Sequence, residues 1–341
     1  MERLSVMLCF FIVMTCCFVS ATCYVSCLPH ERDALLAFKS EYYMDSAAAK
    51  QLGSWRGFNC CDWHGVQCSQ YSSHVILLRF SKNYFHPFKM LHPAFFQLKY
   101  MKHLDLSCNY FTGVLPRGLF SLQKLRYLDL KQNRFEGEIP VEVGSLFNLT
   151  YLNLGMNSFQ GRVPWQFGNL SHLEFLDVSK LKKHPQLGTL YGVEGMNLHG
   201  SSVRWIENLR KLKTLSLGGI VLNVTSRELE AALSHLHHLQ RLELLVCQLS
   251  GHIPNAIQNL TSLSSLILDS NEFSSIVPSW LGSMPHLQEL SLSENPSLSG
   301  DIAHILWSEW PQLTKFDLSG TNVTGSIPPC IGNISLLAHP S

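Results

Sequence analysis

The sequence has almost no net charge and few long apolar runs. Its 26 Lys and Arg residues nearly balance 25 Asp and Glu residues, so the formal charge is +1. A nucleic-acid-binding protein usually carries a strong basic excess, and this balance gives no sign of one. Outside the first residues, no apolar run is long enough to predict a membrane helix. With 46% hydrophobic residues, the chain is nevertheless too apolar to be a disordered polar segment.

The chain also lacks the short motifs of common enzymes. It contains no nucleophile elbow, HExxH, P-loop or GxGxxG. His235, His237 and His238 lie close together, but no cysteine or carboxylate follows at the spacing of a zinc site. We therefore expect no enzyme activity, no catalytic residue, no cofactor and no metal site.

Residues 1–21 are predicted to be a secretory signal peptide. Arg3 gives a basic start, an apolar core follows, and small residues up to Ala21 give a cleavage site. A signal-anchor helix is the alternative, but the apolar core is short for a span of about 20 residues. Eleven cysteines and six glycosylation sequons fit the secretory pathway. The sequons are at Asn148, Asn169, Asn223, Asn259, Asn322 and Asn333.

A block of 24 residues recurs along the chain. It begins at Leu98 as LKYMKHLDLSCNYFTGVLP, and the same spelling, LxxLxxLxLxxNxFxGxxP, returns at Leu122 and Leu146. This is the spacing of a leucine-rich repeat, so the predicted fold class is an α/β solenoid. Each LxL core should form a short strand with its leucines inward, and the strands should stack as a parallel β-sheet on the concave face. A solenoid binds partners on that face.

The repeats are predicted to occupy residues 74–335, in about ten copies. An N-terminal cap at 22–73 precedes them and a short tail at 336–341 follows. The irregular segment 180–208 lengthens one repeat, which could form a loop at the binding face. We favour the alternative of a degenerate repeat whose Trp205 and Ile206 still pack inward.

An asparagine after each strand is predicted to satisfy buried backbone groups of neighbouring repeats. Cys247 and Thr321 occupy the same position and could do part of this work, whereas Leu181 and Ile220 could not. The asparagines are Asn83, Asn109, Asn133, Asn157, Asn271 and Asn295.

The cap contains a cluster of four cysteines: Cys27, Cys60, Cys61 and Cys68. Because the open end of a solenoid exposes apolar surface, a crosslinked cap is expected there. We expect Cys27–Cys60 and Cys61–Cys68 bonds. Adjacent cysteines do not easily pair with each other, but the sequence alone leaves the connectivity open. No pairing is predicted for Cys23, Cys108, Cys247 and Cys330.

One stripe of the concave face is a candidate ligand-binding site. The position before each LxL core reads His103, Tyr127, Tyr151 and Phe175 in successive repeats. The position between the two core residues reads Asp105, Asp129, Asn153 and Asp177. Aromatic residues are enriched in interfaces, and an exposed acidic row would favour a basic peptide or protein. The structural alternative is that Tyr favours strands and Asp is common at this repeat position.

The spelling of the repeats resembles one plant class. The endings GEIP at 137–140 and GSIP at 325–328, the cap CCDWHGVQC and the opening ERDALLAFK resemble plant extracellular leucine-rich-repeat proteins. The segments WIENLRKLKTLSLGGIVLN and LVCQLSGHIPNAIQNLTSLSSLILDSNEFSSIVPSWL are similar to the middle repeats of receptor-like proteins in the fungal-xylanase-receptor group.

This resemblance implies a right-handed superhelix and a cell-surface receptor. Such a receptor would recognise a peptide or protein in immune or developmental signalling, and receptor-like kinase partners would signal for it. The implied location is the extracellular side of the plasma membrane or the apoplast.

The chain stops at Ser341 without the C-terminal cap, acidic stretch and membrane helix of that group. We therefore expect a truncated receptor, with membrane attachment only if the full-length gene adds a helix. A second hypothesis is a secreted inhibitor of microbial cell-wall-degrading enzymes, similar to polygalacturonase-inhibiting proteins. Those close their C-terminal cap with a disulfide, whereas only Cys330 is present here. A third hypothesis is a truncated product without function. The ligand is not identified.

Overall fold

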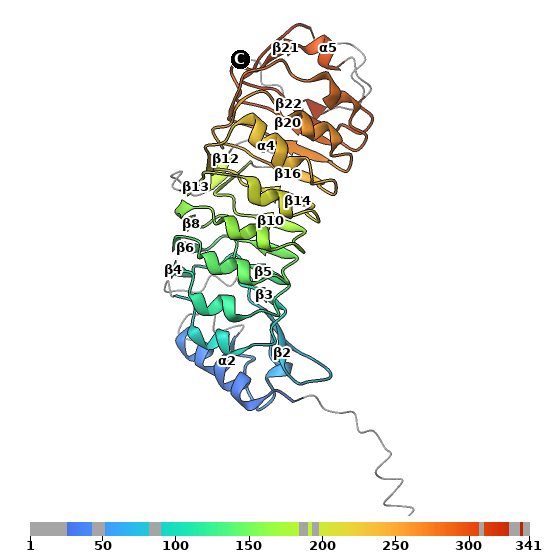
Figure 1. Ribbon diagram of the computed structural model, residues 1–341. Coiled ribbons are helices and arrows are strands. Elements are labelled where there is room, and N and C mark those ends of the chain that lie inside the picture. The colour runs from blue at the N-terminus through green and yellow to red at the C-terminus, as the bar shows by residue number, and fades with distance from the viewer. Residues whose placement is uncertain are drawn as a thin grey trace, which may run out of the picture.

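The computed structural model describes residues 26–42, 52–81, 90–183, 190–192, 198–306, 310–326 and 335–336. The expected signal peptide and Cys23, Asn83, Cys330 and Asn333 lie outside these ranges. The described residues form a long, curved stack of repeats that runs from a helical cap to the last strands (Figure 1). Within them, every helix is too short or too polar to cross a bilayer.

A twelve-stranded sheet runs the length of the described stack. Its first pair is antiparallel and each later pair is parallel, because every repeat returns over the opposite face before adding its strand. Leucines of the LxL core such as Leu128 and Leu130 are buried, as their spacing predicted. In spatial order the strands are β1 (Val66–Cys68), β2 (Val75–Arg79), β3 (His103–Asp105), β5 (Tyr127–Asp129), β7 (Tyr151–Asn153), β10 (Phe175–Asp177), β14 (Thr214–Ser216), β16 (Arg241–Glu243), β18 (Ser265–Ile267), β20 (Glu289–Ser291), β22 (Lys315–Asp317) and β24 (Ser335–Leu336).

The opposite side of the stack carries short helices, mostly single turns of 3-10 helix (Figure 1). A proline in extended conformation, such as Pro140, often precedes the helix, since its fixed φ suits the entry to a first turn. The 3-10 helices are η2 (Pro93–Gln97), η3 (Arg117–Ser121), η4 (Val141–Ser145), η5 (Trp165–Asn169), η6 (Arg204–Asn208), η7 (Asn255–Asn259) and η8 (Ser279–Ser283). The α-helices on this side are α4 (Ser226–Leu233) and α5 (Ile302–Leu306).

Small side sheets connect the concave strands to these helices. Gly137 in one of them has φ +75°, and an added Cβ would lie 2.8 Å from Cγ1 of Val114 in the preceding repeat, so glycine is required there. The strands of the side sheets are β4 (Thr112–Val114), β6 (Arg134–Gly137) and β8 (Ser158–Phe159); β9 (Gly161–Arg162), β13 (Leu198–Gly200) and β15 (Val221–Leu222); β17 (Ser250–Gly251) and β19 (Glu272–Phe273); and β21 (Ser299–Asp301) and β23 (Asn322–Thr324).

The asparagine ladder is formed as predicted. Nδ2 of Asn133 donates to the carbonyls of Leu130, at 3.0 Å, and Leu106, at 2.9 Å, and Oδ1 accepts from the Phe111 N–H at 3.1 Å. One side chain thus satisfies backbone groups of its own and the preceding repeat. The asparagines that donate in the same way are Asn109, Asn157, Asn271 and Asn295.

Two other side chains replace part of this ladder. The Cys247 thiol donates to the carbonyls of Leu217 and Leu245, at 3.3 and 3.4 Å. The Thr321 hydroxyl donates to the Leu318 carbonyl at 2.6 Å. Both residues therefore do the partial work expected from their position.

The irregular segment does not interrupt the large sheet, because β10 pairs directly with β14. Its surplus begins with an antiparallel pair, β11 (Leu181–Lys183) and β12 (Leu190–Gly192). The following strand β13 then joins a side sheet between β9 and β15. Trp205 and Ile206 are 6% and 0% exposed, so the inward packing we favoured is confirmed.

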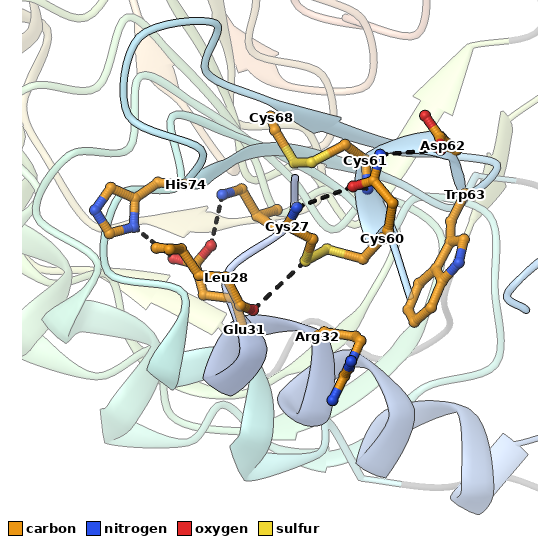
Figure 2. Close-up of a disulfide and its surroundings, with 12 residues drawn as sticks. Cys27, Leu28, Glu31, Arg32, Cys60, Cys61, Asp62, Trp63, Cys68 and His74 are labelled. Carbon is orange, nitrogen blue, oxygen red and sulfur yellow. Dashed lines mark hydrogen bonds and ion pairs between the residues drawn. A yellow bond between two sulfur atoms is a disulfide. The ribbon is translucent and has the colours of Figure 1, made fainter. Parts of the chain in front are cut away.

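The cap is built on helix α2 (Pro29–Tyr42) and the turn η1 (Cys60–Asp62). Disulfides join Cys27 to Cys60 and Cys61 to Cys68, the connectivity expected (Figure 2). Phe38 is fully buried and its ring centroid lies 4.4 Å from that of Phe95 on η2, just before the first regular repeat. The cap therefore covers the apolar end of the solenoid.

Candidate functional site

Four rings on neighbouring strands form a continuous stack on the concave sheet. They are His103, Tyr127, Tyr151 and Phe175, and we call them the ring stack. Successive centroids lie 4.0, 4.2 and 4.2 Å apart, with an interplanar angle of 10° at each step. Each side chain is half-buried. The sequence-predicted aromatic stripe is thus brought together as one surface.

In-register parallel pairing produces the ring stack. The strands pair His103 with Tyr127, Tyr127 with Tyr151, and Tyr151 with Phe175. Because neighbouring strands lie about 4.8 Å apart, rings at equivalent positions come within stacking distance. The inner rings cover one another's faces, so the stack offers solvent mainly ring edges.

The acidic row is buried beside the ring stack, so the expectation of an exposed acidic surface was wrong. Asp105, Asp129, Asn153 and Asp177 are 8%, 7%, 3% and 2% exposed. Each Oδ1 accepts the backbone N–H two residues later, at 3.1, 2.9, 3.0 and 2.9 Å respectively. These bonds close a turn at the end of each strand, a role that Asp and Asn fill readily. We call these four residues the floor row.

The ring stack and the floor row meet at Asp129. The hydroxyls of Tyr127 and Tyr151 each lie 3.4 Å from Asp129 Oδ2, and Asn153 Nδ2 donates to the Tyr151 hydroxyl at 3.3 Å. Burial raises the pKa of Asp129 to about 6, although the hydrogen bond from the Lys131 N–H opposes this shift. Burial also raises the pKa of both tyrosines, so their hydroxyls remain donors at neutral pH.

Arg79 on β2 lies at the N-terminal end of the ring stack. Its Nη2 lies 3.3 Å from Nε2 of His103, and its Nε lies 3.8 Å from Oδ2 of Asp105. Burial and the Arg79 charge lower the pKa of His103, which favours a neutral imidazole. Arg79 was not predicted as a site residue, although Leu78-Arg79-Phe80 matches the LxL pattern with a different second core residue.

The later repeats carry a polar network in place of rings. Arg241 Nε donates to Glu243 at 2.7 Å, and its Nη1 lies 3.3 Å from Glu289. Lys315 Nζ lies 3.6 Å from the other Glu289 oxygen. Burial lowers the pKa of Arg241, but the two carboxylates outweigh it and raise the pKa overall. Hydroxyls of Ser216 and Ser265 donate to Glu243 and Glu289 respectively.

The predicted glycosylation sites within the described residues lie outside the twelve-stranded sheet. Asn148 lies between η4 and β7, and its Nδ2 donates to the Gln123 carbonyl at 2.9 Å. The other four are exposed. They are Asn169 and Asn259 at the ends of η5 and η7, Asn223 after β15, and Asn322 at the start of β23. Glycans at these positions would leave the concave sheet uncovered.

The remaining described cysteines form no disulfide, and the histidine cluster after α4 is exposed. Cys108 and Cys247 are not disulfide-bonded within the described residues. The Cys108 thiol donates to Gln132 Oε1 at 3.4 Å. His235, His237 and His238 are exposed after α4. Among the described residues, the potential metal-ligand atoms that do converge belong to Cys27, Cys60 and Cys61, which are engaged in disulfides.

Three segments of the chain match known protein families. Residues 80–293 match the family described as Leucine-rich repeat region, and residues 28–69 match the Leucine rich repeat N-terminal domain. Residues 312–334 match a further Leucine Rich Repeat.

Receptor-like protein 6 of Arabidopsis thaliana is 28% identical over 92% of the chain. The chain spans only 27% of that relative's length.

Two solved structures have the same fold. The leucine-rich-repeat ectodomain of the Arabidopsis receptor kinase HAESA, in complex with an N-terminally extended IDA peptide hormone, superposes with a TM-score of 0.74 and 27% identity. It matches 91% of this chain and 48% of HAESA's. HAESA with IDA and the co-receptor SERK1 gives a TM-score of 0.70 and 26% identity over 88% of this chain and 47% of HAESA's.

Proposed function

Because the chain belongs to the leucine-rich-repeat family, we propose that it is the extracellular ligand-binding region of a plant cell-surface receptor-like protein. It resembles the leucine-rich-repeat regions of plant receptor-like proteins and the ectodomains of peptide-hormone receptors. Its ligand would be a peptide or protein, bound on the concave sheet without catalysis.

The ring stack is the observation that carries this proposal. Its four half-buried rings are held in register by the sheet and stack at centroid distances of 4.0–4.2 Å. Rigid aromatic side chains give contact area at low entropic cost, which suits a binding surface. The described sequons lie off this surface, so glycosylation would leave it accessible.

Signalling would then depend on partner kinases. The HAESA structures hold a peptide hormone, and one also holds the co-receptor SERK1. By analogy, a receptor-like kinase would join this chain's ligand complex at the outer face of the plasma membrane or in the apoplast.

Site-specific photocrosslinking tests the proposed surface. A benzoylphenylalanine at position 151 would capture apoplastic peptides or proteins on the ring stack. The same group at Val141, which is 53% exposed on η4, is the matched control. We expect crosslinked ligand at position 151 alone. Capture at position 141 alone would contradict the proposal.

An inhibition assay tests the secreted-inhibitor hypothesis directly. The purified chain would be added to microbial polygalacturonase, with the Tyr151→Ala variant alongside. Inhibition by both forms, without a crosslinked ligand at position 151, would favour the inhibitor over the receptor.

A further inference from the structure

The exposed charge around the ring stack is positive, which bears on the chemistry of its ligand. Arg79, Lys102 and Arg126 are exposed and Lys131 is half-buried. Lys102 and Arg126 directly precede His103 and Tyr127 in the chain, at the leading edge of the sheet. Lys131 lies two residues beyond Asp129, on the other side of the ring stack. The four cations therefore lie on or next to β2, β3 and β5, and β3 and β5 carry the first two rings.

The nearby carboxylates are already engaged. Asp105 and Asp129 are buried and accept backbone N–H groups at the strand ends. Glu174 is paired with Lys213 at 2.7 Å. Within the described part of the chain, by contrast, Lys102, Arg126 and Lys131 form no ion pair. The floor row offsets part of the positive charge from below, but the groups that a partner reaches first are cationic.

The geometry of the ring stack also selects among anionic partners. A sugar ring packs against the face of an aromatic ring, and here the inner faces are covered by neighbouring rings at 4.0–4.2 Å. Ring edges remain, and they carry the positive end of the aromatic quadrupole. Edges of this kind suit carboxylate and carbonyl oxygens and apolar side chains, all of which an extended acidic peptide provides.

The later repeats offer no comparable attraction. Arg241 and Lys315 are both neutralised by Glu289, and Arg241 also by Glu243. An anionic segment would have to break these pairs to bind there. The cations without an ion pair therefore flank the ring stack on β3 and β5, and Arg79 on β2 adds a cation whose carboxylate partner, Asp105, lies 3.8 Å away.

We propose that the ring stack binds an extended acidic peptide segment, whose carboxylates pair with Arg79, Arg126 and Lys131 while its backbone and apolar side chains cover the ring edges. This deepens the proposed function and rests on it. An exposed acidic row would have favoured a basic partner. Because that row is buried, the proposed partner is acidic instead.

Selection from a phage-displayed library of random peptides tests this proposal. Selection on the purified chain should enrich peptides rich in Asp and Glu. The variant R79A/R126A/K131A should bind the recovered peptides roughly tenfold more weakly, since each exposed ion pair contributes about 1.5- to 5-fold. The control variant R117A/K124A/R227A removes equal charge from exposed residues outside the site and should bind them unchanged.

Each remaining outcome has one meaning. Neutral or basic peptides that crosslink at position 151 would overturn the acidic ligand and leave the proposed binding surface intact. Acidic peptides that bind both triple variants equally would overturn the assignment of these cations. Failure of every recovered peptide to crosslink at position 151 would overturn the binding surface itself. Oligogalacturonate that binds through the same cations, with no acidic peptide recovered, would replace the peptide with an anionic polysaccharide.

Discussion

The buried Glu31 carboxylate on cap helix α2 accepts the backbone N–H of Val75 at 2.7 Å, across 44 residues of sequence. Its other oxygen lies 3.0 Å from Nδ1 of His74 (Figure 2). The His74 ring in turn stacks on that of Tyr100, with centroids 3.6 Å apart. Glu31 is 1% exposed. One cap residue thus fixes the start of the large sheet.

Glu31→Ala should therefore destabilise the junction between the cap and the repeats. The Val75 N–H would be buried without an acceptor, which costs about 1–3 kcal/mol, and the His74 contact would be lost as well. Urea unfolding and amide exchange at Val75 measure the effect. Asp33→Ala on the exposed side of α2 is the control, and equal stability of the two variants would contradict this role.

Asn133→Ala should lower the free energy of unfolding by more than a substitution of similar size at the surface. It leaves the carbonyls of Leu106 and Leu130 and the Phe111 N–H without the Asn133 side chain. A loss of about 2–4 kcal/mol in the free energy of unfolding is expected, since each buried unsatisfied group costs about 1–3 kcal/mol. Gln123→Ala, at an exposed position, should change stability by less than about 0.5 kcal/mol. A similar small change for Asn133→Ala would argue against the ladder.

Asp129→Asn should stabilise the protein at neutral pH. Burial raises the Asp129 pKa to about 6, above its ordinary value of 3.8. Between these two pH values the folded state holds a proton that the unfolded state has released, and above them the folded state carries a buried charge. Stability from this group is therefore present below about pH 4 and is lost as the pH rises through about 6. Asparagine keeps an Oδ1 acceptor for the Lys131 N–H, as Asn153 does for Gly155.

Unfolding free energies measured from pH 4 to 7.5 test this prediction. The variant should gain on the order of 1–3 kcal/mol at pH 7.5 and show a flatter pH profile. Asp129→Ala, which removes the acceptor, is the contrasting control and should be destabilised. A parallel loss of stability for Asp129→Asn at every pH would show that the charge is favourable where it lies.

Tyr151→Ala should weaken the ring stack at its centre. Tyr151 stacks on both Tyr127 and Phe175 at 4.2 Å, and each stacked pair contributes about 0.5–1.5 kcal/mol beyond area burial. We expect a total loss of about 2–4 kcal/mol, with Tyr151→Phe losing less than about 1 kcal/mol. Thermal unfolding compares them with Tyr71→Ala, a fully exposed position. Equal stabilities for Tyr151→Ala and Tyr71→Ala would mean the rings are not coupled.

Repeat spacing was enough to predict the strands, the inward leucines and the ring stack. Equal positions in equal repeats must align when the strands are parallel and in register, so His103 and Tyr127 could be placed together from sequence. The burial of Asp129 could not be predicted in this way, because alternation along a strand gives the direction of a side chain and not what covers it. Asp129 is buried because side chains of neighbouring strands pack around it.

Departures from the repeat were less predictable. The LxL-like Leu78-Arg79-Phe80 precedes the regular repeats, so its register with β3 depends on pairing that spacing does not fix. The β11–β12 pair likewise arises within a segment that has no counterpart in other repeats. The repeat pattern predicts structure where the solenoid is regular, and Arg79 shows that residues of the candidate site can lie just outside that range.

The thiol in the asparagine ladder has a consequence for oxidative folding. Thiol–disulfide exchange needs an accessible thiolate, and burial raises the pKa of Cys247 to about 12 while no solvent reaches its side chain. Once its repeat has closed, Cys247 is thus kinetically removed from exchange with the Cys27–Cys60 and Cys61–Cys68 bonds of the cap. Correct repeat stacking would protect the correct disulfides.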